Sequence, residues 1–159
     1  MILPALRPGL LWVATGLPLT GTLRVCRGDA ATARERRFDF ITGEGTIAGT
    51  PTGARGTLAL SGGVTGEGFW GQFTYVDEGT GMTVNSTGVT AYRRGATDNS
   101  RYIEGTAEID GVGGYTYAVE VTDNGESGRE DTFSVVLSNG YRAGGLLVEG
   151  NVQLQQPCR

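Results

Sequence analysis

The sequence contains no histidine and no lysine, and its thirteen cationic side chains are all arginines. Without histidine there is no Ser-His-Asp triad, Cys-His pair or His-ligated metal, and without lysine there is no Schiff base. The formal net charge is −4, and the arginines form no basic stripe of the kind that binds nucleic acid. These absences predict a protein that is not an enzyme, has no resident cofactor and does not bind nucleic acid.

Long apolar runs are also scarce. The longest lies within residues 1–20, where Leu10 to Leu19 follow Arg7. This run is too short for a transmembrane helix, and its length is that of the apolar region of a signal peptide. We therefore expect residues 1–36 to be an N-terminal extension, either a signal peptide or a linker. Residues 37–159 are expected to form a single domain with no integral membrane segment.

The chain has only two cysteines, Cys26 and Cys158. A disulfide between them would enclose nearly the whole domain, and the chain-entropy model assigns about 5 kcal/mol to so long a loop. Such a crosslink suits an extracellular protein with a small core. The core is indeed lean, because leucine, isoleucine, valine and phenylalanine total 36 of 159 residues. Two unpaired thiols are the alternative.

Glycine, in contrast, is abundant, with 28 residues, and from Phe38 onward it separates segments in which apolar and polar residues alternate. This period of two is typical of strands with one buried face. Asn139-Gly140 separates two such segments and predicts a hairpin with a type I′ turn. About eight or nine strands with short connections predict an all-β fold, an antiparallel up-and-down β-barrel or a barrel-like sandwich.

The alternation also predicts which side chains face the interior. An interior lined by aromatic rings could hold a small ligand, because an eight-stranded barrel has room for packed side chains or for one small molecule. The residues expected to line it are Phe69, Phe73, Tyr75, Tyr115, Tyr117 and Phe133. A small-ligand-binding barrel is therefore one alternative function.

The acidic segment 123–131 gathers oxygen-bearing side chains between two glycines. Calcium prefers six to eight oxygen ligands from a flexible loop. The candidate ligands are Asp123, Asn124, Glu126 and Asp131, with Asp77 and Glu78 as further donors from another loop. An ordinary solvated turn, neutralised in part by Arg129, is the competing interpretation.

Two further groups of side chains are expected on the outer surface. Glu104, Glu108 and Glu120 are expected to face outward and stay solvated, which does not favour a pair of catalytic carboxylates. An exposed Trp70 could form a sugar-binding platform with three tyrosines, although aromatic residues in sheets more often pack across strands. Those tyrosines are Tyr92, Tyr102 and Tyr141.

The carboxyl-terminal half resembles the bacterial post-COAP domain family. The segments that carry the resemblance are Asp123–Glu126, Asp131–Phe133, Ser138–Tyr141 and Gly150–Leu154. The resemblance implies a glycine- and threonine-rich extracellular β module of uncharacterised function, often found at the end of multidomain surface or secreted proteins. The chain departs from the family pattern in having no histidine near Gln72, near Glu78 or after Leu154.

Together these observations predict a secreted or cell-surface bacterial β domain with a non-enzymatic structural or interaction role. A rigid scaffold would present the loops 77–81, 93–100, 110–114 and 123–131 to a partner. That partner is expected to be another domain of a surface protein or a glycan. A calcium-dependent carbohydrate-binding domain is the second alternative function.

Overall fold

The computed structural model describes residues 39–125 and 127–156, and all of its regular structure is β-strand. The eight strands are β1 (Asp39–Ile47), β2 (Gly56–Thr65), β3 (Gly68–Asp77), β4 (Met82–Arg94), β5 (Ser100–Ile109), β6 (Val112–Thr122), β7 (Thr132–Leu137) and β8 (Arg142–Gln155). In this part of the chain, no helix is long and apolar enough to cross a membrane. The predicted all-β fold is confirmed.

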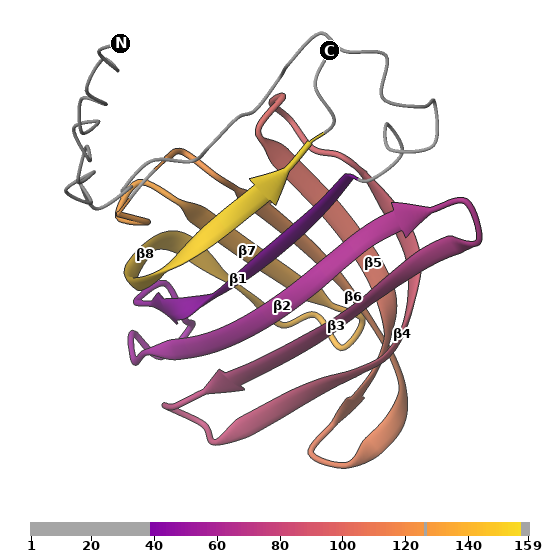
Figure 1. Cartoon of the computed structure of the whole chain (residues 1–159). Coiled ribbons are helices and arrows are strands. Elements are labelled where there is room, and N and C mark those ends of the chain that lie inside the picture. Colours follow the sequence, from indigo (N-terminus) through magenta and orange to yellow (C-terminus); the bar gives the residue numbers. More distant parts are fainter. Residues whose placement is uncertain (1–38, 126, 157–159) are drawn as a thin grey trace, which may run out of the picture.

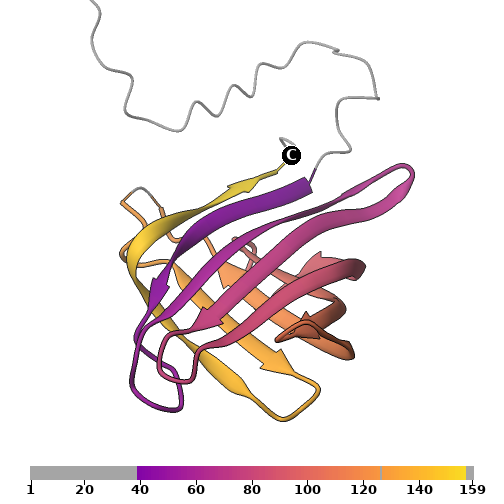
Figure 2. The same cartoon turned by 90° about the horizontal axis from the view of Figure 1, so that it is seen from below.

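The strands form one closed antiparallel barrel in which each strand pairs with its neighbours in the sequence. The barrel closes where β8 pairs with β1, in a register that runs from Phe40 opposite Gln155 to Ile47 opposite Leu147. Figures 1 and 2 both show these first and last strands side by side. The up-and-down barrel was therefore predicted correctly, and the sandwich alternative is not needed.

The structure has a type I′ turn at a different hairpin from the one predicted. Asp110 and Gly111 join β5 to β6 with φ angles of 51° and 77°, so both central residues have the positive φ of a type I′ turn. At Asn139-Gly140 only the glycine has positive φ, and Gly140 N–H donates to the Leu137 carbonyl over 3.0 Å. The loop from 138 to 141 is longer than two residues, so the predicted type I′ turn is wrong there.

The barrel interior is filled by side chains from all eight strands. Phe73 lies at its centre, with its ring centroid 5.0 Å from that of Tyr117 and 6.1 Å from that of Phe133. Tyr75 continues this cluster, because its ring lies 6.0 Å from that of Phe133. Burial of these rings supplies much of the apolar area that stabilises so glycine-rich a chain.

The pairing of β3 with β4 is much shorter than the strands themselves. Only Thr74–Asp77 of β3 pair with Met82–Asn85 of β4. Beyond this ladder the Phe73 N–H donates to the Ser86 hydroxyl over 2.8 Å. Register shifts around Thr87 and Thr90 mark bulges at which β4 turns away from β3. The barrel wall therefore has a seam between the first half of β3 and the second half of β4 (Figure 1).

Candidate functional site

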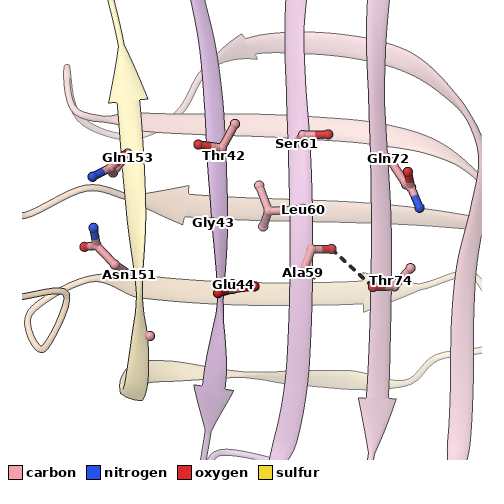
Figure 3. A pocket seen from close by; sticks show the side chains of 11 residues that line it. Thr42, Gly43, Glu44, Ala59, Leu60, Ser61, Gln72, Thr74, Asn151 and Gln153 are labelled. Carbon is pink, nitrogen blue, oxygen red and sulfur yellow. Dashed lines mark hydrogen bonds between the residues drawn. The ribbon is translucent and has the colours of Figure 1, made fainter.

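A groove of about 650 Å³ lies on the outside of the barrel, over strands β8, β1, β2 and β3. The register of these strands places its outward-facing side chains, most of them polar, in two rows. One row consists of Gln153, Thr42, Ser61 and Gln72. The next row consists of Asn151, Glu44, Ala59 and Thr74. Figure 3 shows both rows crossing the four neighbouring strands.

Two glycines lie beneath this face, where β1 and β8 pair. Gly43 has no room for a side chain, because a Cβ atom there would lie 2.9 Å from Val152 Cγ2 and 3.0 Å from the Asn151 carbonyl oxygen. Gly150 has a φ of 104°, and a Cβ atom there would collide with the backbone of Glu44. These two glycines allow β1 and β8 to approach closely beneath the groove.

The polar groups of the groove are largely free to bind another molecule. Within the described residues, the side-chain hydrogen bond among them runs from the Thr74 hydroxyl to the Ala59 carbonyl, at a long 3.5 Å (Figure 3). The Asn151 Oδ1 atom also lacks a partner in this part of the chain, but it is buried and is not accessible from the groove. Amide and hydroxyl groups can both donate and accept hydrogen bonds. The groove therefore offers unused donors and acceptors, together with the Glu44 carboxylate.

An aromatic pair borders the groove on the same outer face. Phe40 and Trp70 lie in the adjacent row, on either side of Gly63, with their ring centroids 6.0 Å apart. A Cβ atom at Gly63 would lie 2.9 Å from Trp70 Nε1, so glycine lets both rings rest against the sheet. Trp70 remains 39% exposed.

The predicted outward orientation of Trp70 is confirmed, but the tyrosines proposed to accompany it lie elsewhere. Tyr92 is buried and donates its hydroxyl to Asp39 over 2.6 Å. Tyr141 donates to the buried Asp77 over 2.9 Å. Tyr102 lies under the Arg93 guanidinium, which is 4.1 Å from its ring centroid. These side chains therefore do not form one platform, and Phe40 is the aromatic partner of Trp70.

The acidic loop after β6 uses its carboxylates to fix the backbone. Asp131 is fully buried and accepts the N–H groups of Asn124 and Val152, each over 2.8 Å. Asp123 accepts the N–H group of Leu154 over 2.9 Å. Glu126 lies outside the described residues, and in the described ranges no three acidic or cysteine side chains are grouped as a metal site would require. The two aspartates tie this loop to β8.

Two further donors considered for calcium lie at the other end of the barrel. Asp77 is the last residue of β3, whereas the acidic loop precedes β7. Because β3 and β7 run in the same direction, the two lie at opposite ends of the barrel. The Asp77 carboxylate accepts the Tyr141 hydroxyl and the Gly79 N–H. Glu78 is exposed and accepts the Thr57 hydroxyl over 2.9 Å. Burial raises the pKa of Tyr141, and the hydrogen bonds to Tyr75 and Asp77 raise it further.

An ion pair between a buried arginine and a partly exposed aspartate occupies the end of the barrel where β1 begins. Arg101 is 1% exposed, and its Nε and Nη2 atoms both donate to the Asp39 carboxylate over 2.7 Å. Burial acts to raise the pKa of Asp39, but the hydrogen bonds from Arg101 and Tyr92 outweigh it, so the pKa lies below its ordinary value. Burial, followed by the bond to Asp39, raises the pKa of Tyr92. The remaining donor group, Arg101 Nη1, bonds the backbone carbonyls of Asp98 and Ser100.

The three outward glutamates lie on the opposite wall, as the alternation predicts. Glu104 receives two hydrogen bonds from Arg93, over 3.0 and 3.3 Å, and these bonds lower its pKa. Glu120 accepts the Ala96 N–H over 2.8 Å. Glu108 is half-buried on β5. They are spread along two strands.

The aromatic residues expected to line a ligand cavity pack against one another instead. Phe73, Tyr75, Tyr117 and Phe133 are each at most 2% exposed and form the central cluster. Tyr115 is only partly buried against this core. Phe69 does not line the interior as expected: it is 47% exposed because it lies beside the seam, where β4 no longer covers β3.

The loops expected to be displayed do not share one surface. Loops 77–81 and 110–114 lie at the end of the barrel where β1 finishes. Loops 93–100 and 123–131 lie at the end where β1 begins. Residues 1–36, with the proposed extension and Cys26, lie outside the described residues, and so does Cys158.

The groove residues were missed by the sequence analysis because they are ordinary outward-facing polar residues. Their grouping depends on the register of β8 against β1, which joins segments more than a hundred residues apart in the sequence. Comparison of the chain with known proteins gives no match to a family model, a curated protein or a solved structure.

Proposed function

We propose that this protein is a non-enzymatic binding module that holds a carbohydrate in the groove over β8, β1, β2 and β3. The observation that supports this most directly is the set of polar groove side chains that, apart from Thr74, have no hydrogen-bond partner among the described residues. Binding sites use a few well-placed polar groups to orient a ligand. Sugars present hydroxyl groups that both donate and accept, which match the amide and hydroxyl side chains here.

A binding role is favoured over catalysis because the titratable groups with strong partners serve structural contacts. Asp39, Asp77 and Asp131 each accept hydrogen bonds that hold strands or loops in place. The groove itself contains a single carboxylate, Glu44, whereas glycoside hydrolysis generally requires a pair. A secreted or cell-surface location, as a module of a larger protein, would bring such a groove into contact with glycans.

The proposal is tested by screening the full chain on a glycan array and measuring its hits by calorimetry, with calcium and then with chelator. Replacing Gln72 or Gln153 by alanine should weaken binding about three- to tenfold, because each change removes one ligand hydrogen bond. Gln156→Ala is the matched control, since this side chain lies beyond β8 and bonds the Asp98 carbonyl. We expect calcium to make no difference, because Asp123 and Asp131 are occupied by backbone amides.

Two results would contradict this proposal. One is the failure of every glycan to bind. The other is binding that is unchanged in Gln72→Ala and Gln153→Ala but lost when Phe73 or Tyr117 is altered in a variant that still folds. The second result would favour a small ligand in the barrel interior.

A further inference from the structure

The proposed carbohydrate groove has an aromatic border on one side, and this border limits the kind of sugar that fits. The row containing Phe40 and Trp70 precedes the row containing Thr42 and Gln72 by two residues on each strand. Two residues of a strand span about 6.7 Å. A sugar ring resting on Trp70 would thus have its hydroxyl groups within reach of the first polar row.

The Trp70 side chain is held in a fixed position for such a contact. It packs against Phe40 at a centroid distance of 6.0 Å, and Gly63 leaves room beneath both rings. An exposed, prepositioned indole offers a large apolar area at little cost in conformational entropy. Sugars whose C–H groups gather on one face of the ring present the matching apolar surface.

The charge of the groove selects against a second class of sugar. Glu44 is the single charged side chain among the residues that line it. The row next to that of Glu44 contains Glu149, which lies opposite Thr46. Glu149 is already paired with Arg55, with 3.3 Å between Arg55 Nη1 and Glu149 Oε2. The lining therefore supplies no cation to a carboxylate or sulfate group, and Glu44 would repel one.

We propose that the ligand is an uncharged glycan, one sugar of which stacks on Trp70 while Glu44 accepts hydrogen bonds from its hydroxyl groups and excludes anionic glycans. This inference rests on the proposed carbohydrate-binding function and adds the class of sugar and the two residues that select it. Trp70 provides affinity, and Glu44 provides discrimination between neutral and acidic chains.

The test compares neutral hexasaccharides of glucose, N-acetylglucosamine, mannose and xylose with oligogalacturonate and chondroitin sulfate. The wild-type chain should bind at least one neutral hexasaccharide and neither anionic glycan. Trp70→Ala should weaken that binding by about tenfold or more, as expected for a buried aromatic anchor, and Trp70→Phe should restore part of it. Val76→Ala, an exposed position three rows beyond Trp70 on β3, should leave binding unchanged.

The charge prediction has its own variant. Glu44→Gln retains hydrogen-bonding groups and removes the negative charge, so it should permit measurable binding of oligogalacturonate. Thermal melting of each variant establishes that it is folded before its binding is compared.

The outcomes separate the two proposals. If no glycan binds, the proposed function fails. If a glycan binds in a manner that depends on Gln72 but not on Trp70, or if the wild-type chain binds anionic and neutral glycans equally, the function stands and this inference is overturned.

Discussion

The two walls of the barrel differ in how their outer polar side chains are used. On the wall formed by β4 and β5, Arg93 bonds Glu104 over 3.0 Å and the Thr87 hydroxyl donates to that of Thr106 over 2.8 Å. On the wall formed by β8, β1, β2 and β3, the described groove side chains make a single hydrogen bond of 3.5 Å, from Thr74. Both walls are rich in polar groups, yet one satisfies them internally and the other leaves them open.

This difference shows that composition alone does not identify a binding surface. Threonine and charged residues occur on both walls, and what distinguishes the groove is unused hydrogen-bonding capacity on a hollowed face. A clear expectation follows: changes to paired side chains should alter stability without altering glycan binding, and changes in the groove should do the reverse.

The largest effect on stability is expected from Arg101→Met, which leaves Asp39 without its buried partner. Breaking a fully buried pair costs about 3–5 kcal/mol in the free energy of unfolding, and because Asp39 is itself 30% exposed the loss should lie at the lower end of this range. Because the pKa of Asp39 is lowered in the folded protein, its contribution is present above the unfolded value of about 3.9 and is lost as pH falls. In denaturant unfolding, the difference in the free energy of unfolding between wild type and Arg101→Met should thus become smaller below about pH 4.

Arg94→Met is the control for that measurement. Its partner Asp98 is 76% exposed, and such surface pairs contribute less than about 1 kcal/mol. Equal losses in the two variants would contradict a special role for the buried pair.

A second effect should appear in alkali. Burial raises the pKa of Tyr117 to about 12, so the fold favours its neutral phenol. A group whose pKa is raised on folding stabilises the protein below its unfolded value, here about 10, and this stabilisation is lost as pH rises. Tyr117 alone should account for roughly 2–3 kcal/mol between pH 10 and 12. In Tyr117→Phe, the free energy of unfolding should therefore fall less between about pH 10 and 12 than it does in the wild-type protein.

A smaller effect is expected where backbones approach closely on the paired wall. A Cβ atom at Gly105 would collide with the Gly88 carbonyl and the Tyr117 ring, whereas one at Gly88 would meet only Thr106 Oγ1, at 3.4 Å. Gly105→Ala should destabilise the barrel by about 1–3 kcal/mol, and Gly88→Ala by much less. Equal melting temperatures for the two variants would show that the wall can relax at this point.

The smallest effects test the two walls directly. Thr106→Val removes the hydroxyl that bonds Thr87, and it should cost about 0.5–1.5 kcal/mol without changing glycan affinity. Thr42→Val removes a groove hydroxyl with no partner in the described residues, so stability should be unaffected and affinity reduced. Thermal melting measures the stability of both variants, and calorimetry measures their glycan affinity. If Thr106→Val lost affinity and Thr42→Val lost stability, the proposed difference between the walls would be wrong.

Local pattern was sufficient to predict the barrel but not the groove. Alternation placed Phe73, Tyr75 and Phe133 inside correctly, because a buried face imposes a period of two wherever a strand lies. The alternation failed at Phe69, which lies beside the seam and therefore has no strand packed over it. Whether a neighbouring strand covers a side chain depends on the tertiary structure, and the alternation within one segment does not indicate it.

The site was harder to predict because it depends on register. Nothing in the sequence indicates that Glu44 lies between Asn151 and Ala59, since that requires the pairings of β1 with both β8 and β2. The acidic loop drew attention because its carboxylates are close together in sequence, yet Asp131 serves to fasten that loop to Val152. Spacing along the chain was therefore a poor guide to availability for binding.

The seam has a consequence for how the molecule comes apart. The two strand edges at the seam differ in sequence. The edge of β4 carries Arg93, Arg94 and two bulges, whereas the facing stretch 69–73 of β3 has neither charge nor proline. Natural sheets usually protect an unpaired margin with such features. We therefore expect local opening of the barrel to begin with separation of the β2–β3 hairpin from β4. At high protein concentration, we expect aggregation to begin at the unprotected edge of β3.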